Sequence, residues 1–377
     1  MTSFQLQSPN CPSLSVRSSP STVQYRMPQT YKLTCNSSFT RLKMSIPSTP
    51  QTVLGCGMAA VDFLVAVDSF PKPDDKIRST SFQVQGGGNA GNALTCAARL
   101  GLSPRIISKV GDDSQGKAIL EEFEADGVDT SFMVSKGGHS TFSYVVVDSQ
   151  TKTRTCIYTP GYPPMIPEDL SKSNLSSALD DVRLVYFDGV LQEAELLSAL
   201  VAWTGNPSVP DALVSVLLKL PNVKFVIVTL GEDGCMMLER SEAEDLQSEE
   251  SDVNELFKKM KKSIDTDSTS ATCISSDITQ LHAKGIGTVS GRLLLGTAEK
   301  IPPSELVDTT GAGDAFIGAV LYALCTNMPP ERMLTFASQV AGIGCRALGA
   351  RAGLPHITDP RLRPLLVNDP QNMATLL

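Results

Sequence analysis

The stretch VDTTGAGDAFIGA, residues 307–319, decides how the rest of the chain is interpreted. Two aspartates, Asp308 and Asp314, flank residues with almost no side-chain bulk, and an apolar segment of helical character follows. Small residues let backbone N–H groups approach an anion, and the start of a helix favours negative charge. The turn at 311–313 is therefore a candidate anion hole, and Asp314 a candidate general base for phosphoryl transfer. An aspartate that caps a helix is the alternative, and the spacing alone leaves both open.

A second glycine-rich segment, GGGNAGN at 86–92, contains paired amides. Asn89 and Asn92 have the groups to hydrogen-bond vicinal hydroxyls, as a polyol site requires; capping of a helix is the alternative. A dinucleotide site needs GxGxxG directly after the first strand, whereas this loop comes well after it and has different spacing. The sequence also contains no GxxxxGK motif followed by Ser or Thr.

Two more polar positions lie near the ends of predicted strands. Asp62 follows the first strand among apolar residues, where a buried carboxylate needs a partner such as a ligand hydroxyl; a surface turn is the alternative. In VTLGEDG, Thr229 precedes Gly231 and Gly234 at the carboxyl end of a predicted strand. Open α/β sheets bind ligands at such ends, although an ordinary tight turn has the same composition.

Predicted strands and helices alternate along most of the chain. Strand-like runs occur at 52–68, 105–111, 181–190 and 223–234, with helix-like segments between them. This alternation predicts an α/β fold with a mostly parallel sheet and helices on both faces. A hairpin at 140–161 and a segment around 76–85 predict a smaller, separate β layer. Two helices, at 313–325 and near 330–347, are expected to close the fold.

The composition favours a globular protein that handles small molecules. Hydrophobic residues make up 41% of the chain, yet no apolar run reaches the roughly 20 residues that a membrane span needs. A net charge of −8 argues against a nucleic-acid partner, which favours a basic face. The nine cysteines include no CxxC pair, so they indicate reduced thiols. With three histidines, a His-based metal site is not expected.

The first 50 residues differ from the rest of the chain. They contain no Asp or Glu, many Ser and Thr, and five basic residues. This composition is typical of an organelle transit peptide, most plausibly for the chloroplast; a disordered leader on a cytoplasmic protein is the alternative. Between 239 and 284 the chain is charged and polar with few aliphatic residues, which predicts a solvated, partly disordered acidic insertion.

Together these motifs resemble the pfkB family of carbohydrate kinases, which has the ribokinase-like fold. DTTGAGDAFIGA is close to the family's C-terminal signature and GGGNAGNA to its N-terminal one, in the right order and at the right distance. The stretches at 61–78 and 336–350 are similar to ketohexokinase. The likeness runs from about Val53 to Pro355. It implies a three-layer α/β/α sandwich at 51–365, with a small β lid at about 68–86 and 140–160 and a tail at 366–377.

The resemblance also implies roles for individual residues in the ATP-dependent phosphorylation of a sugar hydroxyl. By motif match the general base is Asp314, and the anion hole is formed by Gly311, Ala312 and Gly313. The sugar would be held by Asp62, Gly88, Asn89 and Asn92, with Arg154 of the hairpin closing on it. The ATP phosphates would lie along Thr229, Gly231 and Gly234, with Ser338 near the adenine. Mg²⁺ would accompany ATP, and Asp308 and Thr310 would supply oxygens to a monovalent cation such as K⁺, as in some members. Family lids often pair between subunits, which implies a homodimer.

One departure from the family pattern follows the segment VYFDG. The family runs helix, strand, helix, strand and helix before the VTLG strand, but residues 190–222 leave room for two helices only. Two parallel strands are therefore missing, together with the Asn-x-x-Glu region that helps order Mg²⁺. The junction near Ser198–Trp203 is typical of an internal deletion. We expect low stability or low activity, because tens of buried side chains at roughly 1.5–3 kcal/mol each exceed the marginal stability of a domain.

Three functions remain in competition at this point. The first is a sugar kinase acting on ribose or a ketohexose such as fructose, and the intact Asp314 motif favours it. The second is a catalytically weak regulatory or scaffold protein of plastids, which the missing segment favours. The third is a nucleoside kinase acting on a substrate such as adenosine, which the ketohexokinase-like stretches disfavour. The hydroxyl that accepts the phosphate is not decided by spacing.

Overall fold

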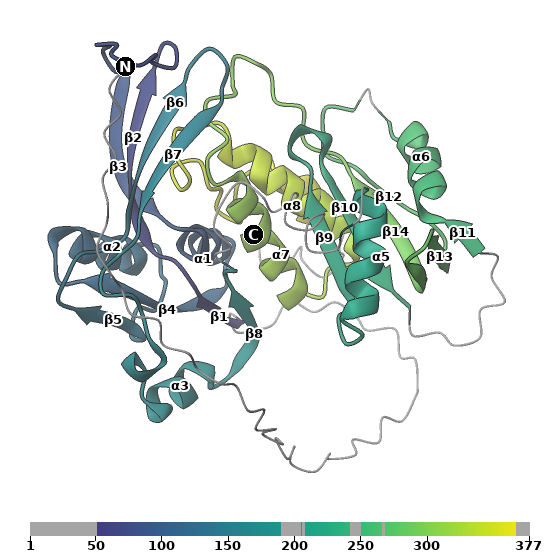
Figure 1. Cartoon of the computed structure of the whole chain (residues 1–377), viewed down its shortest axis with the longest axis horizontal. Coiled ribbons are helices and arrows are strands. Elements are labelled where there is room, and N and C mark those ends of the chain that lie inside the picture. Colours follow the sequence, from purple (N-terminus) through teal and green to yellow (C-terminus); the bar gives the residue numbers. More distant parts are fainter. Residues whose placement is uncertain (1–50, 190–204, 206–207, 242–249, 266–267, 367–377) are drawn as a thin grey trace, which may run out of the picture. The chain divides into compact units, whose positions relative to one another are not determined.

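The computed structural model describes residues 51–189, 205, 208–241, 250–265 and 268–366, all within one compact unit (Figure 1). The leader at 1–50, the tail beyond Leu366 and the junction at Ser198–Trp203 lie outside the described residues. The described helices are α1 (Asn89–Arg99), α2 (Ser114–Ala125), α3 (Lys172–Leu179), α5 (Val209–Lys219), α6 (Val253–Ser263), α7 (Ala312–Cys325), α8 (Pro330–Gly344) and α9 (Arg363–Leu366).

The first sheet is parallel throughout, as the alternation of strands and helices predicts. Its strands, in the order β5-β4-β1-β8, are β5 (Met133–Lys136), β4 (Ser103–Gly111), β1 (Thr52–Cys56) and β8 (Val182–Phe187). Successive residues of a strand point to opposite faces. Val53 and Leu54 are neighbours on β1, and both are almost fully buried, each in a different apolar cluster. The centre of this sheet is therefore covered on both faces.

The second sheet differs from the prediction because most of its pairs are antiparallel. Its strands follow the order β11-β13-β14-β10-β9, and β12 pairs with β14 outside this order. The strands are β9 (Phe225–Thr229), β10 (Cys235–Arg240), β11 (Glu250–Asp252), β12 (Cys273–Ser275), β13 (Thr279–Ala283) and β14 (Gly287–Gly296). Short turns join β9 to β10 and β13 to β14, and such turns permit antiparallel pairing only. α8 packs on one face, while α5 and α6 contact the other.

The third sheet is the separate β layer that the hairpin predicts. Its order is β3-β2-β6-β7, formed by β3 (Ser81–Gly87), β2 (Ala60–Val67), β6 (Phe142–Asp148) and β7 (Arg154–Thr159). We call this sheet the lid. Leu64, Val145 and Leu348 form a small buried cluster on one of its faces.

The expectation of a partly disordered insertion at 239–284 is wrong for the residues described there. The side chain of Asp252 caps α6 by accepting hydrogen bonds from the backbone amides of Asn254 and Glu255. Val253 and Met260 are buried, and Leu256 and Phe257 pack beside them against the second sheet. Apolar residues spaced three and four apart make one helical face, and that face outweighs the polar composition. Residues 242–249 and 266–267 lie outside the described part of the chain.

Helices α1 and α7 pack closely, and this contact positions the candidate site. A Cβ at Gly318 would lie 2.5 Å from the carbonyl oxygen of Ala93, so glycine permits the approach of the two backbones. The Cys96 thiol donates to the Ala315 carbonyl at 3.4 Å. α8 packs against α7 in turn (Figure 1), and one apolar cluster joins these three helices to both larger sheets.

Candidate active site

The first turns of α1 and α7 meet at a hydrogen bond between two predicted site residues. Asn92 lies in the first turn of α1 and Asp314 in that of α7. The Nδ2 of Asn92 donates to the Oδ2 of Asp314 at 2.9 Å. The structure thereby brings together residues from the two signature motifs, which are far apart in the sequence.

The turn before α7 has the geometry of an open anion site. Gly311 has φ of 73°, and a Cβ there would lie 2.4 Å from that of Ala350, so both conformation and space favour glycine. A Cβ at Gly313 would meet nothing within 4 Å. In the described part of the chain no side chain caps this helix, although the amide of Ala312 donates to the carbonyl of Thr309 at 3.3 Å. The positive end of a helix favours an anion.

Burial raises the pKa of two carboxyl groups at this site. The pKa of Asp314 rises from 3.8 to about 7, because burial and then the charges of Asp188 and Asp62 oppose its ionisation, whereas Asn92 and Arg154 favour it. Burial likewise raises the pKa of Asp62 to about 6, against the opposing effect of Arg351. Asp314 therefore changes protonation near neutral pH, as an efficient general base does.

The residues predicted to hold a sugar surround this pair. Asp62 lies on β2, 6% exposed, and a Cβ at Gly87 would come within 2.3 Å of its Oδ2. Gly88 has φ of 86° and precedes α1, whose first residue, Asn89, is exposed. These residues place carboxylate and amide groups, which bond hydroxyls, around the approach to Asp314.

Arg154 connects the lid to the candidate anion hole. It is exposed on β7, and its Nη1 donates to the Oγ1 of Thr309 at 3.2 Å. Thr309 lies in the loop that enters α7. The lid therefore contacts this loop, and closure of Arg154 on a substrate stays a prediction.

Asp308 and Thr310 are bonded to each other. The Oδ1 of Asp308 accepts from both the amide and the hydroxyl of Thr310, and its Oδ2 accepts from the amide of Gly349. Asp308 is fully buried. Three donors on one carboxylate suit a brace for the loop and leave it poorly fitted to a cation, so no step of the reaction is assigned to K⁺.

The predicted nucleotide residues divide into two groups. Thr229, Gly231 and Gly234 lie together at the β9–β10 turn, where a Cβ at Gly234 would be 2.1 Å from the Gly296 carbonyl oxygen. Ser338 is 7% exposed on α8, and its hydroxyl bonds the thiol of Cys235. Its side chain thus packs toward the second sheet, and its placement near an adenine stays a prediction.

Asp188 is a site residue that the sequence analysis missed. It follows β8 directly, and its Oδ2 accepts from the amides of Met58 and Ala90 at 3.1 and 3.2 Å. Its charge contributes, after burial, to raising the pKa of Tyr158 on the lid. Its position at the carboxyl end of a parallel strand was the signal that could have identified it.

Arg351 is a second missed residue, in the segment after α8. It is 1% exposed and bonds the Oδ1 of Asn92 at 2.9 Å, the Gly87 carbonyl at 2.8 Å and Glu122 at 3.2 Å. Its guanidinium carbon lies 4.7 Å from the centre of the Phe123 ring. No motif marks this arginine, because all these contacts are with residues distant in sequence.

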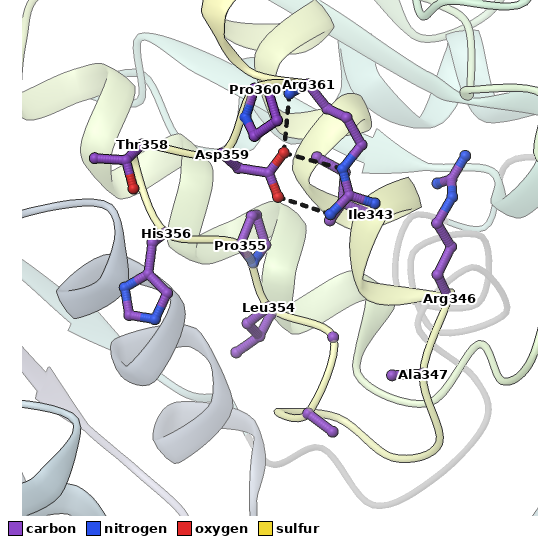
Figure 2. Close-up of a pocket in the computed structure, with 12 residues that line it drawn as sticks. Ile343, Arg346, Ala347, Leu354, Pro355, His356, Thr358, Asp359, Pro360 and Arg361 are labelled. Carbon is purple, nitrogen blue, oxygen red and sulfur yellow. Dashed lines mark hydrogen bonds and ion pairs between the residues drawn. The ribbon is translucent and has the colours of Figure 1, made fainter. Parts of the chain in front are cut away.

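A pocket of about 480 Å³ lies elsewhere, between the end of α8 and residues 352–361 (Figure 2). Its two arginines are already paired: Arg346 with Glu299 and Glu305, and Arg361 with Asp359. It contains none of the predicted site residues.

The described residues also bear on metal binding and on membrane insertion. Within 51–189, 205, 208–241, 250–265 and 268–366, no group of three or more His, Cys, Asp or Glu is arranged to hold a metal ion. No helix in these ranges is both long and apolar enough to cross a membrane. The described side chains thus offer no preformed Mg²⁺ cage, although Mg²⁺ commonly binds through substrate phosphates with one or two carboxylates.

Known proteins resemble this chain in sequence and in fold. The model of the pfkB family carbohydrate kinases matches residues 51–200 and 292–357. The ribokinase of Bacillus subtilis is 28% identical over 79% of this chain and 94% of its own, and the ketohexokinase of Mus musculus 25% identical over 79% and 97%. The structure of Arabidopsis thaliana ribokinase complexed with ribose and ATP has a TM-score of 0.53 at 20% identity, covering 84% of this chain and 99% of that one. The fold is ribokinase-like.

Proposed function

The chain belongs to the pfkB family of carbohydrate kinases, and on that premise we propose that it is a sugar kinase, which transfers the γ-phosphoryl group of ATP to a sugar hydroxyl. The observation that carries the proposal is the hydrogen bond of 2.9 Å between Asn92 and Asp314 at two converging helix starts. Asp314, whose pKa burial raises to about 7, lies in the first turn of α7, a helix without a side-chain cap among the described residues. A proton acceptor and an anion site thus occur together.

In the proposed reaction Asp314 takes the proton of the sugar hydroxyl. The hydroxyl oxygen forms a bond to the γ-phosphorus, and the bond from that phosphorus to the bridging oxygen of ADP breaks. The amides at 311–313 would face the charge on the transferring group, and the amide of Ala312, which donates to the Thr309 carbonyl at 3.3 Å, would have to exchange or share that bond. Mg²⁺ would enter with the ATP phosphates and offset their charge.

The relatives suggest the class of acceptor. Asp62, Asn89 and Asn92 present oxygens and N–H groups suited to sugar hydroxyls, and Arg154 of the lid bonds the loop beside them. Proteins named ribokinase and ketohexokinase are among those similar to this chain. Ribose and a ketohexose such as fructose are therefore the first substrates to test, with adenosine as the nucleoside alternative.

A coupled assay of ADP release over ribose, fructose, other ketoses and adenosine tests the proposal. A sugar is expected to stimulate ADP release, and Asp314→Asn is expected to lower the rate about 10²–10⁴-fold, the usual contribution of a general base. If no acceptor raises ADP release above the Asp314→Asn background, the kinase proposal fails. That result would favour the regulatory or scaffold protein, which the segment predicted to be missing near Ser198–Trp203 supports.

The acid-free leader supports a proposed chloroplast location. A fluorescent protein fused after residue 50 is expected to enter plastids, and the same fusion without residues 1–50 to remain in the cytoplasm. Equal distribution of the two fusions would remove the transit-peptide proposal.

A further inference from the structure

The orientation of the Asn92 amide follows from the chemistry of its two neighbours. A guanidinium group has only donors, and a carboxylate only acceptors. Because the Nε of Arg351 lies 2.9 Å from one end of the amide and the Oδ2 of Asp314 lies 2.9 Å from the other, the carbonyl must face Arg351 and the NH₂ must face Asp314. Reversal of the amide would create two repulsive contacts at once.

Arg351 is itself held on several sides. Its guanidinium bonds Glu122 on α2 and the carbonyl of Gly87. Its own carbonyl accepts from the Nη1 of Arg99 at 2.7 Å. A buried group with this many partners has little freedom to rotate, so it can hold the amide in one orientation.

We infer that Arg351 is a positioning residue for the reaction: through the Asn92 amide it keeps a hydrogen-bond donor on Asp314 and so favours the ionised base. This inference rests on the proposed function, because it assigns Arg351 a part in the same site. Arg351 bonds Asn92 and acts on Asp314 through that amide. Its charge also lowers the pKa of Asp62, and loss of this second effect would favour ionisation of Asp314 and so oppose the shift expected from losing the Asn92 contact.

The other charged and titratable groups near Asp314 fix the direction of the expected effect. Asp188 and Asp62 oppose ionisation of Asp314, and Arg154 favours it. Tyr186 and Cys96 also lie within electrostatic reach, but burial raises the pKa of each further above neutral. Without the hydrogen bond from Asn92, the exposed Arg154 of the lid would be the remaining group of this set that favours ionisation of Asp314, against the charges of Asp188 and Asp62. The pKa of Asp314 should then rise further.

The experiment compares Asn92→Ala, Arg351→Met and the double variant, measuring kcat/KM with the best sugar between pH 5.5 and 9. In each single variant the acid limb of the profile is expected to move upward by about one pH unit. Activity should largely recover on the alkaline side in Arg351→Met, whereas Asn92→Ala should also lose activity at every pH because it removes a proposed sugar-binding group. The double variant should move no further than Asn92→Ala, because Arg351 acts through that amide. Arg346→Met is the matched control: it removes an ion-paired arginine from the same segment without contact to Asn92, and its limb should not move.

A second measurement separates this inference from the proposed function. Titration of Asp314 by ¹³C NMR of protein labelled at the aspartate carboxyl carbons, assigned with Asp314→Asn, needs no turnover. The same upward shift is expected in Arg351→Met, even if the wild type phosphorylates none of the acceptors. Where Arg351→Met does not fold by circular dichroism, Arg351→Lys provides the test, with a smaller shift in the same direction. A uniform loss of activity with an unmoved limb, an unmoved carboxyl titration, or additive shifts in the double variant would each overturn the inference.

Discussion

Burial holds protons on Asp314 and Asp62 at pH values where the unfolded chain has released them, because their native pKa values are about 7 and 6 against 3.8. The native state therefore binds more protons than the unfolded state between about pH 4 and 7. Stability accordingly falls as pH rises through that range, and the penalty is complete above pH 7.

We expect Asp314→Asn to stabilise the protein at pH 8 by about 1–2 kcal/mol while it abolishes most activity, because the neutral amide avoids the penalty of a buried charge. At pH 4, where the native carboxyl is already protonated, the gain should nearly vanish. Thermal unfolding of both proteins at the two pH values measures the effect. Equal Tm differences at pH 4 and pH 8 would show that the pKa of Asp314 is not raised.

Two glycines of the same turn should respond differently to alanine. Gly313→Ala adds a methyl group in open space within α7, so stability should stay constant or rise by up to about 1 kcal/mol. Activity should fall at least tenfold, because the methyl group occupies the proposed phosphoryl position. Gly311→Ala combines a positive φ with a contact to Ala350 and should destabilise by about 1–3 kcal/mol. Urea unfolding with the ADP assay distinguishes the two, and a fully active Gly313→Ala would argue against the anion hole.

Sequence reasoning at this scale identified residues that lie in compact motifs. Asp314, Asn92 and the glycines occur beside the turns and helix starts that give them their chemistry, so local sequence was sufficient. Arg351 contacts Asn92 across a sequence separation of 259. A single sequence contains no record of such a contact, which arises only when the segment after α8 folds back on the glycine-rich loop.

At the scale of elements, the lid presents an apolar outer face. Phe63 pairs with Val84 on one side and Tyr144 on the other, and Tyr144 pairs with Ile157, so these side chains share one face of the sheet. Phe82, two residues before Val84, lies on the same face. The exposed fractions are 60% for Phe82, 53% for Val84, 48% for Tyr144 and 57% for Ile157. Such a contiguous apolar patch favours association.

We therefore expect a homodimer formed through the outer face of the lid. Replacing Phe82 and Ile157 together by Lys should shift the protein toward monomer by at least tenfold in dissociation constant, since burying two charges in this interface is unfavourable. Sedimentation velocity across a concentration series measures the shift. Leu175→Lys on α3, where Leu175 is 43% exposed, is the control and should leave association unchanged. A wild type that stays monomeric at high concentration would contradict the prediction.

Element prediction succeeded where periodicity was undisturbed. The hairpin at 140–161 and the helices that became α5, α7 and α8 show clear strand or helix patterns. α6 escaped notice because lysines and acidic residues surround its four apolar positions, and composition obscured the spacing. The antiparallel second sheet was missed because strand alternation alone does not reveal the length of each connection.

For the molecule as a whole, the described strands of the α/β core form two sheets rather than one. β8 ends the first sheet and β9 ends the second, and each has one paired neighbour among the described residues. Val185 and Phe187 on β8 are 40% and 72% exposed. In the family pattern two further parallel strands would cover these edges. Residues 190–204 and 206–207, which follow β8, lie outside the described part of the chain, so the absence of the two strands stays a prediction.

If the chain lacks the two strands, the edges of β8 and β9 predict marginal stability and association through edge strands. Residues of the first and second sheets pack with α7 and α8 in one apolar cluster. The two sheets are therefore held together by helix packing and not by backbone hydrogen bonds between neighbouring strands. We expect unfolding in urea at a midpoint at least 1–2 M below that of a full-length ribokinase, with a broadened transition because the two sheets can separate. Circular dichroism and size-exclusion chromatography along the same series follow the loss of structure and the loss of compactness.

Val185→Lys tests the edge directly. The substitution places a charge on β8, a strand with one paired neighbour among the described residues. It should reduce aggregation severalfold. The unfolding midpoint should not fall, because the side chain of Val185 is already 40% exposed. Ala212→Lys in α5, at a fully buried position, is the opposite control and should unfold the second sheet. A wild type with one sharp transition and the turnover of a ribokinase of known activity would overturn the prediction that the loss of two strands limits the stability and activity of this chain.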